Sequence, residues 1–410
     1  MLVSLLISVV GAQISDWDQE LNTLLTTNPE VRIADRQIAA REAAIKVAGT
    51  LPDPKFEFST ALAPVETRNG PIENQLMLGQ KFPLWGKLSR QEKIAVLNRE
   101  LARQNARQVR LSIINQFETR FAQYVQITRS LNILNGYRAE LESFRNVALT
   151  QYSTGQGLTQ HPILKLQIEQ TRVEAKTNDL MGKKVAVLES LTRLFNEPVD
   201  TVRLASLNWP PREEEPLAGW VAAATTSNPL LQSSLIKKEI ATVTRELSEK
   251  QNLPDLVAGV TYTVVGPTDL PGAVAAGKNA LGVKIGLNLP LWLGRNKARV
   301  ESARQTEEAS QITTVDVGNK VTERIETILA ALAQTDETVA LYENRLLPEA
   351  EQMLSSAYAA YKTGKISFLD LLDSERMTVT LKLEYERVLM EQRIGEANLR
   401  KVVGLLNIEG

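Results

Sequence analysis

Cysteine is absent from this 410-residue sequence, so the chain can form neither disulfide bonds nor thiolate metal sites. Aromatic residues are scarce at 5%, whereas residues that favour helices are plentiful, which is typical of long helices that pack side by side. The only histidine is His161, beside Pro162 at the start of a predicted helix. One histidine excludes a multi-histidine metal site or a histidine-based catalytic network within one chain. The composition therefore predicts a mainly helical protein.

A large net charge of either sign is also lacking. Lys and Arg number 47 and Asp and Glu number 48, without a long basic run, so we expect no nucleic-acid partner. A glycine-rich phosphate loop, a G-x-S-x-G elbow and an H-E-x-x-H string are all missing. We therefore predict that the chain is not an enzyme and has no catalytic residue, no cofactor and no resident metal. His161 is interpreted as solvent-facing, and a weak metal contact among several copies stays open.

Long hydrophobic runs are missing after the first residues. The run Met1–Ala12 is apolar and ends in Val10-Gly11-Ala12, so residues 1–13 are predicted to be a signal peptide or its remnant. The run lacks the positive charge that usually precedes such a segment, so a buried strand or helix is the alternative. No later stretch approaches 18 apolar residues, and no transmembrane helix is predicted.

What the sequence does contain is a repeat of about two hundred residues. Five short strings return in the same order in the second half. The string at Asn28-Pro29 returns at Asn228-Pro229, and Leu51-Pro52-Asp53 returns at Leu253-Pro254-Asp255. The other matches are Phe82-Pro83-Leu84-Trp85-Gly86-Lys87 with Leu289-Pro290-Leu291-Trp292-Leu293-Gly294-Arg295, Gln151-Tyr152-Ser153-Thr154-Gly155 with Ala360-Tyr361-Lys362-Thr363-Gly364, and Leu194-Phe195-Asn196 with Leu405-Leu406-Asn407. The chain is therefore interpreted as two copies of one unit.

Each copy is predicted to contain a helix, a β-hairpin and a long helical hairpin. The first repeat is predicted at 17–195, with a helix at 17–49, a β-hairpin at 53–83 and a helical hairpin at 87–195. The second repeat is predicted at 217–410, with a β-hairpin at 254–290 and a helical hairpin at 296–407 that is bent at Pro348. Residues 196–216 hold four prolines and an acidic run, and they are predicted to be a linker outside the core.

Apolar spacing predicts that the long helices have partners along their flanks. From Phe117 to Ala148, apolar residues recur at steps of three and four, as in one stripe of an amphipathic helix. After the first turn a strict seven-residue period favours coiled-coil packing of antiparallel neighbours. The residues of this period are Leu166, Val173, Leu180, Val187 and Leu194.

The two β-hairpins are the candidate membrane segments. Their strands, near 55–62, 73–82, 257–263 and 283–289, alternate apolar residues with small or polar ones, as a barrel with a wet interior requires. Alternation alone also fits two small soluble hairpins. Because four strands cannot close a barrel and an open edge is not viable in lipid, insertion would require several copies. Aromatic residues near the strand ends would form a membrane-interface girdle, namely Phe56, Phe82, Trp85, Tyr262 and Trp292.

This layout resembles that of the TolC-type outer-membrane efflux proteins over residues 17–410. The strings that carry the resemblance are Asn28-Pro29-Glu30, Leu51-Pro52-Asp53-Pro54, Gln80-Lys81-Phe82-Pro83-Leu84-Trp85-Gly86-Lys87, Tyr152-Ser153-Thr154-Gly155-Gln156-Gly157, Leu347-Pro348 and Ala359-Ala360-Tyr361-Lys362-Thr363-Gly364. The resemblance implies a homotrimer in which four strands per chain build one 12-stranded β-barrel and the helices build an α-barrel. It also implies an outer-membrane location extending into the periplasm. The partners that it implies are a periplasmic adaptor protein, an inner-membrane transporter and outer-membrane lipid.

The function that the resemblance implies is the exit duct of a tripartite efflux pump for small solutes such as metal cations or drugs. The Leu-Pro-Asp-Pro and Phe-Pro-Leu-Trp-Gly-Lys strings are more similar to the heavy-metal or divalent-cation branch. Two departures are His161-Pro162 after the first turn and Ile366, which stands where some relatives have a hinge arginine. The alternative function is a structural coiled-coil scaffold, either periplasmic or secreted.

Two turns are expected to form the periplasmic tip of the helical hairpins. The first lies around Tyr152, Gly155 and Gly157, and the second around Tyr361 and Gly364.

An acidic pair after the second turn is the candidate pore entrance. Asp370 and Asp373 are three residues apart and therefore share one side of a helix. The resemblance raises the hypothesis that three copies stack these carboxylates as two rings that select cations. The other interpretation is that they are ordinary carboxylates near a helix N-terminus, which its dipole favours.

Overall fold

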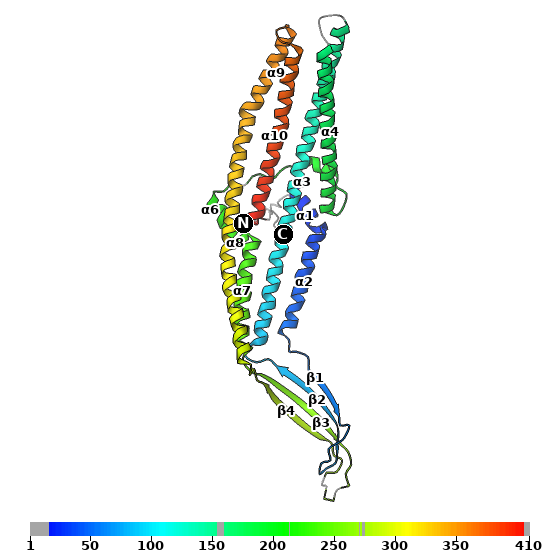
Figure 1. Cartoon of the computed structure of the whole chain (residues 1–410), viewed down its shortest axis with the longest axis vertical. Helices are drawn as coiled ribbons and strands as arrows, with labels where there is room; N and C mark the ends of the chain where they lie inside the picture. The colour runs from blue at the N-terminus through cyan, green and yellow to red at the C-terminus, as the bar shows by residue number, and fades with distance from the viewer. Residues whose placement is uncertain (1–15, 154–159, 213, 270, 273–274, 406–410) are drawn as a thin grey trace, which may run out of the picture. The chain divides into compact units, whose positions relative to one another are not determined.

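The computed structural model describes residues 16–153, 160–212, 214–269, 271–272 and 275–405. The chain is mainly helical with one four-stranded sheet, as predicted (Figure 1). It divides into two compact units that are each discontinuous in sequence: unit 1 is Met1–Ile33, Arg107–Pro229 and Asn319–Gly410, and unit 2 is Ala34–Ala106 and Leu230–Gly318. None of the described helices is long and apolar enough to cross a membrane.

The elements follow the predicted order in both halves of the chain. The first half contains α1 (Asp16–Thr27), α2 (Pro29–Gly49), β1 (Lys55–Thr60), β2 (Ile72–Phe82), α3 (Lys87–Ser153) and α4 (Gln160–Phe195). The second half contains α5 (Thr201–Ser206), α6 (Leu217–Ser227), α7 (Pro229–Lys250), β3 (Asp255–Val265), β4 (Ala280–Asn288), α8 (Leu293–Leu341), a π-helical turn (Tyr342–Leu346), α9 (Leu347–Lys362) and α10 (Phe368–Val403).

The first predicted helix, at 17–49, is two helices because Asn28 interrupts it. The Oδ1 atom of Asn28 accepts hydrogen bonds from the backbone N–H groups of Glu30 (2.9 Å) and Val31 (3.3 Å), which caps the start of α2. Its Nδ2 atom donates to the carbonyl oxygen of Leu194 at the end of α4 (2.8 Å). One buried side chain therefore satisfies backbone groups of two helices.

Asn228 repeats this arrangement between α6 and α7. Its Nδ2 atom donates to the carbonyl oxygen of Val402 near the end of α10 (2.5 Å). The end of α4 therefore corresponds to Val402, and the match of Leu194 with Leu405 was wrong by three residues. The correspondence is fixed by where each helix ends. α10 ends at Val403, and the next residue, Gly404, has a left-handed φ of 89°. A Cβ atom at Gly404 would overlap the backbone oxygen of Ser227.

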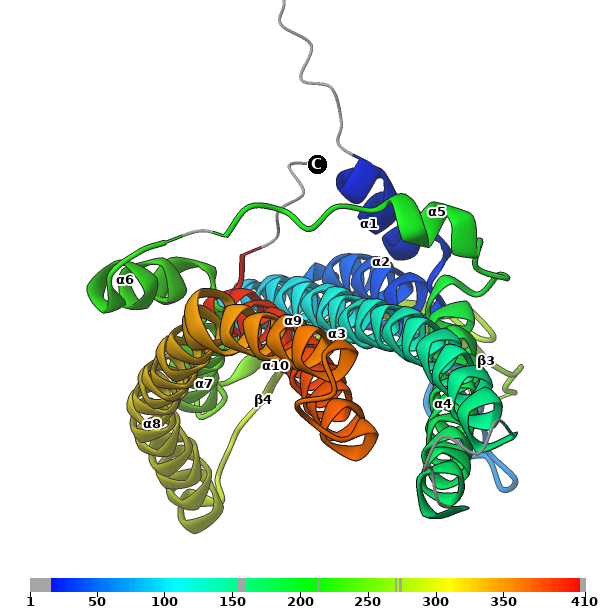
Figure 2. The same cartoon turned by 90° about the horizontal axis from the view of Figure 1, so that it is seen from above.

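The core of unit 1 lies along α3 and α4, which pack side by side (Figure 2). The predicted apolar stripe of α3 lies in this core, where Phe117, Phe121 and Leu141 are fully buried and Phe144 is half-buried. All five residues of the predicted seven-residue period on α4 are buried. Both periodicity predictions are confirmed.

Residues 196–216, which were expected to lie outside the core, contribute to the core of unit 1. They contain the short helix α5, and Leu204 and Leu207 are buried. The ring of Trp209 lies 5.0 Å from that of Phe121, centroid to centroid. Proline content indicated where regular structure breaks, but the apolar residues between the prolines pack onto the long helices.

The irregularity expected at Pro348 takes the form of a π-helical turn just before it. This turn, Tyr342–Leu346, joins α8 to α9. Proline lacks a backbone N–H, and in a regular α-helix its ring collides with the carbonyl group four residues earlier, here that of Asn344. The wider π turn accommodates both problems without ending the helix.

The sheet belongs to unit 2, and its strands follow the order β1-β2-β3-β4, all antiparallel (Figure 1). The pairing of β2 with β3 joins the hairpin of the first repeat to that of the second. No other strand of the described chain pairs with the outer edges of β1 and β4. The sheet therefore ends in two open edges.

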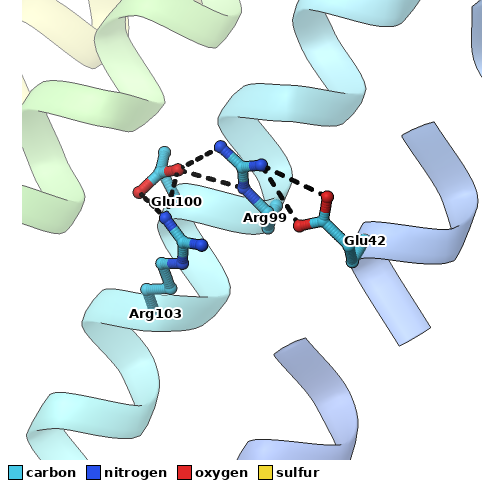
Figure 3. A network of polar contacts seen from close by, with 4 residues as sticks. All are labelled: Glu42, Arg99, Glu100 and Arg103. Carbon is cyan, nitrogen blue, oxygen red and sulfur yellow. Dashed lines mark hydrogen bonds and ion pairs between the residues drawn. The ribbon is translucent and has the colours of Figure 1, made fainter. Parts of the chain in front are cut away.

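In unit 2, an ionic network on the surface joins α2 to α3 (Figure 3). The guanidinium group of Arg99 lies 3.1 Å from the carboxylate of Glu42 and 2.5 Å from that of Glu100, and Arg103 lies 3.0 Å from Glu100. Water and salt screen exposed ion pairs, so each contributes little to stability. The network therefore adds little to the stability of unit 2.

Candidate functional site

The register of the sheet places apolar side chains on one face. Directly paired residues share a face, and the row Phe56, Leu78, Val260, Val283 crosses all four strands. Thr60, Asn74 and Gln80 are the polar exceptions on this face. Val283 is 79% exposed, Ile285 73% and Phe56 65%, so the apolar face has no cover within the described chain. The large apolar residues of this face are Phe56, Phe58, Leu76, Leu78, Phe82, Leu256, Val260, Tyr262, Leu281, Val283, Ile285 and Leu287.

The opposite face carries mostly small, polar and charged residues, and its apolar exceptions are Met77, Val257 and Val265. One row is Lys55, Gly79, Gly259 and Lys284, and the next begins with Glu57. Lys55 and Glu57 form an ion pair on this face (2.5 Å). Strands of nine to eleven residues, as in β2, β3 and β4, match the length that crosses a bilayer at a tilt. The sheet has the chemistry of a wall between lipid and water.

The predicted girdle residues occupy two levels of this sheet. Phe56 lies near the start of β1 and Phe82 at the end of β2, while Trp85 and Trp292 lie in the turns that follow β2 and β4. Tyr262 lies toward the other end, opposite Leu76 and Leu281, and its hydroxyl accepts a hydrogen bond from Asn279 Nδ2 (2.7 Å). Aromatic residues therefore mark both ends of the apolar face.

A group of polar contacts, here named the clasp, closes the junction between the two repeats beside the sheet. Lys87 Nζ lies 2.6 Å from Asp255 Oδ1 and also donates to the carbonyl oxygen of Leu253 (2.7 Å). Lys81 Nζ lies 3.0 Å from Asp255 Oδ2, and Trp85 Nε1 donates to the carbonyl oxygen of Pro254 (2.8 Å). Lys87 and Asp255 are buried, so this ion pair is held out of water, whereas Lys81 is exposed.

The two candidate entrance residues lie in the first turns of α10, and both are exposed. The carboxylate of Asp370 accepts hydrogen bonds from the hydroxyl (2.7 Å) and backbone N–H (3.0 Å) of Ser367, which caps the helix in return. These bonds hold the pKa of Asp370 below its ordinary value. Asp373 forms an ion pair with Arg376 (3.1 Å). Within one chain, both carboxylates therefore have local partners, which is the arrangement of the second interpretation.

Only one of the two predicted tip turns can be described. Gly155 and Gly157 lie outside the described residues, and Tyr152 lies in the last turn of α3. His161 is exposed in the first turn of α4.

The second tip turn is tight. Gly364, with a φ of 70°, donates its N–H to the carbonyl oxygen of Tyr361 (3.0 Å), and Lys365 donates to that of Ala360 (2.9 Å). Left-handed backbone favours glycine at this point. The α9–α10 connection is thus compact, and it leads directly to Ser367 and Asp370.

A residue that the sequence did not reveal is Glu375, two residues beyond Asp373 on α10. It is buried, shares a hydrogen bond with Glu140, and has an Oε2 atom without a hydrogen-bond partner in the described chain. Burial and the neighbouring Glu140 raise its pKa to about 8. Its position three to four residues from apolar Leu371 and Leu372 signals burial, but nothing in the sequence identifies Glu140 as its partner. Among the described residues, no group of three or more His, Asp or Glu is arranged to hold a metal ion.

Comparisons with known proteins agree with this geometry. The family model described as outer membrane efflux protein matches residues 220–405. The chain is 20% identical to the cobalt-zinc-cadmium resistance protein CzcC of Cupriavidus metallidurans over 381 residues, which cover 92% of this chain and 87% of CzcC. Its fold is similar to that of the CmeC outer membrane channel of Campylobacter jejuni (TM-score 0.76, 15% identity, 95% of this chain and 86% of CmeC). The outer membrane protein VceC of Vibrio cholerae is similar to the same degree (TM-score 0.76, 16% identity, 95% of this chain and 98% of VceC).

Proposed function

We propose that this chain is a TolC-type outer membrane efflux protein and that three copies of it assemble into one duct for divalent metal cations. It lies in the outer membrane, extends into the periplasm, and is the exit duct of a tripartite efflux system. Solutes pass through such a duct without chemical change. The proposed function therefore includes no catalytic step and no cofactor.

The observation that carries the proposal is the two-faced sheet with open edges. Unpaired backbone groups in lipid cost several kcal/mol each, so β1 and β4 cannot both end at lipid. Pairing the β4 edge of one copy with the β1 edge of the next removes every open edge when the ring of copies closes. Three copies would supply twelve strands in one closed sheet. A coiled-coil scaffold, the alternative function, has no use for an exposed apolar face on this sheet.

Two observations support divalent cations as the cargo. The relative CzcC is named for resistance to cobalt, zinc and cadmium. Asp370 and Asp373 are exposed and one helical turn apart, so three copies would place six carboxylates around one axis. Rings of carboxylates attract cations and repel anions. Asp370 is ionised at neutral pH, as a cation filter requires, because the ordinary pKa of an aspartate already lies far below 7 and the hydrogen bonds from Ser367 only lower it further.

The partners proposed for the duct are a periplasmic adaptor protein and an inner-membrane transporter. The tight α9–α10 turn at Gly364 and its counterpart after α3 are the proposed tip that the adaptor contacts. The exposed apolar face of the sheet is proposed to contact outer-membrane lipid.

Conductance in a planar bilayer under a salt gradient tests this function. We expect the purified parent protein to form cation-preferring channels. The double variant Asp370→Asn plus Asp373→Asn should move the reversal potential toward zero, because the rings lose their charge while the side chains keep their shape. Block by divalent cations should weaken in parallel.

Ser367→Ala is the matched control, because it removes the helix cap and keeps both carboxylates. Its reversal potential should remain that of the parent. An unchanged reversal potential in the double variant would show that both aspartates are ordinary carboxylates near a helix N-terminus and do not select cations. A parent protein that forms no channel would contradict the duct itself.

A further inference from the structure

The two hairpins of the chain are copies of each other at the level of strand register. In the first hairpin Lys55 faces Gly79, and in the second Val257 faces Gly286. These pairs correspond through the sequence repeat, in which Asp53 matches Asp255 and Pro83 matches Pro290. Further pairs, such as Ser59 with Gln75 and Thr261 with Gly282, correspond in the same way.

The seam between the hairpins has a defined register and its own lock. In the β2–β3 seam Met77 faces Thr261, and Lys81 faces Val257. The clasp lies beside this seam, where Lys87 of the first repeat meets Asp255 of the second. One copy of the chain therefore contains one complete seam, from the end of a second strand to the start of a third.

Both halves of a second clasp are present at the two outer edges of the sheet, apart from each other. Trp292 and Arg295 follow β4 as Trp85 and Lys87 follow β2, and Asp53 precedes β1 as Asp255 begins β3. Lys87 and Asp255 are each 6% exposed, whereas Asp53 and Arg295 are exposed and Trp292 is 74% exposed. The side chains of Asp53, Trp292 and Arg295 form no hydrogen bond or ion pair with any described residue.

We infer that a second copy of this chain completes this clasp: Arg295 of one copy pairs with Asp53 of the next, and β4 pairs with the neighbouring β1 in the register of β2 with β3. Transferring that register places Lys284 opposite Ser59 and Asn288 opposite Lys55 of the neighbouring copy. The inference rests on the homo-oligomeric duct proposed above and adds to it the residues that join the copies.

The transferred register preserves the two faces of the sheet. It places Leu287 opposite Phe56 and Ile285 opposite Phe58, so the apolar face continues from one copy to the next. A slip by one residue would turn Lys284 toward the apolar side of the neighbouring strand, because alternate residues point to opposite faces. The faces therefore exclude every slip by an odd number of residues, which agrees with the register transferred from the internal seam.

Backbone hydrogen bonds give a third agreement. The N–H of Ala61 donates to the carbonyl oxygen of Glu73 (2.9 Å). Because hydrogen-bonded pairs alternate along an antiparallel ladder, the backbone groups of Ser59 and Glu57 also bond to β2. Phe56 and Phe58 then direct their backbone groups to the open edge. By the same correspondence Leu287 and Ile285 do so on β4, and the transferred register pairs them.

Disulfide trapping tests the register, and the cysteine-free parent makes it free of background. The variant Ser59→Cys plus Lys284→Cys places both thiols on the polar face of the proposed seam, within the distance that a disulfide bridges. Inside one copy these positions are three strand spacings apart and four residues out of register, about 19 Å in all, and cannot be joined. Oxidation in outer membranes should give covalent dimers and trimers that disappear on reduction.

Two matched variants control this experiment. Met77→Cys plus Thr261→Cys is the same pair in the internal seam, and it should oxidise without leaving the monomer position on the gel. Lys55→Cys plus Lys284→Cys is displaced by four residues, about 13 Å, from the proposed register and should give no covalent dimer. Covalent dimers from the displaced pair in place of the proposed pair would overturn the register.

Charge exchange tests the clasp. Asp53→Arg and Arg295→Asp should each lower the temperature at which the oligomer dissociates in detergent, and the double exchange should restore most of the loss, since it re-forms the pair in the opposite sense. Lys297→Asp, an equal charge change two residues away, should have little effect. If the double exchange lowers the dissociation temperature by the sum of the two single effects, the proposed ion pair is overturned.

The outcomes separate this inference from the function on which it rests. A parent protein that is monomeric in mild detergent by light scattering overturns both. The seam alone is overturned if the parent forms the oligomer and conducts, the Ser59→Cys plus Lys284→Cys variant gives no covalent dimer, and the internal pair Met77→Cys plus Thr261→Cys forms its disulfide.

Discussion

At the scale of single residues, Asn28 and Asn228 stand out because each serves two helices. Removing either side chain leaves a buried carbonyl oxygen without its donor, and at Asn28 it also removes the cap of α2. We expect Asn28→Ala and Asn228→Ala each to lower the free energy of unfolding by about 1–3 kcal/mol. Thermal unfolding followed by helical circular dichroism measures the loss.

Asn22→Ala is the matched control for this prediction, because Asn22 is exposed on α1. It should change stability by less than about 0.5 kcal/mol. Equal effects at Asn22 and Asn28 would show that the buried hydrogen bonds contribute nothing specific.

Glu375 predicts a pH dependence of the helical hairpins. Its pKa is raised from 4.5 to about 8, chiefly by burial and then by Glu140, with Lys382 opposing the shift. The folded chain therefore holds a proton that the unfolded chain has released above about pH 4.5, and stability falls as pH rises from about 4.5 to about 8. We expect Glu375→Gln to flatten this dependence and to raise the melting temperature at the upper end of the window.

The exposed partner supplies the control for this titration. Glu140→Gln keeps the hydrogen bond but removes the neighbouring charge, so it should move the pH dependence to lower pH without abolishing it. Melting temperatures measured across the window would contradict the assignment if the parent and Glu375→Gln changed in parallel.

Residue roles were harder to predict from the sequence than residue positions. The spacing of Asp370 and Asp373 placed both on one side of a helix start, which the structure shows. The string Ser367-x-x-Asp370 also contained the signal for the capping box, although the sequence alone does not say whether a carboxylate serves the helix or the pore. On the trimer proposed here, three-fold symmetry, which one chain does not contain, decides that question.

At the scale of elements, the sheet makes a prediction about its two faces. Ile285 lies on the apolar face and Gly286 on the opposite one, and a Cβ atom at Gly286 meets nothing within 4 Å. Arginine on a lipid-facing strand position costs about 2–4 kcal/mol at the bilayer midplane. Ile285→Arg should therefore reduce the amount of assembled protein in the outer membrane, while Gly286→Arg should leave it near the parent level.

Membrane fractionation followed by heat-modifiability on a gel measures both variants. Equal loss in the two variants would mean that added bulk, and not contact with lipid, limits assembly. Equal tolerance would contradict the assignment of the apolar face to lipid.

Periodicity predicted the long elements well because each long helix buries one continuous stripe. The stripe beginning at Phe117 and the seven-residue period beginning at Leu166 both proved buried. Short features escaped because they depend on tertiary contacts or on local backbone collisions: α5 packs through Leu204, and the π turn relieves the collision that Pro348 would cause in a regular helix.

At the scale of the whole molecule, the duplication carried most of what could be predicted. It gave the order of elements twice, so each half supported the interpretation of the other. Its weakest point was the end of the repeat, where identity of residues misaligned Leu194 and the buried hydrogen bonds of the two asparagines correct it. The division into two units, each built from separate stretches of both repeats, depends on contacts that no local pattern encodes.

The open edges of β1 and β4 have a consequence for biogenesis. On the trimer proposed here, a newly exported chain has no stable resting place in the bilayer, so insertion and subunit encounter must occur together. The rate of maturation then depends steeply on the concentration of unassembled subunits. While a chain waits, its exposed row from Phe56 to Val283 is an aggregation hazard, and its survival depends on escort through the periplasm.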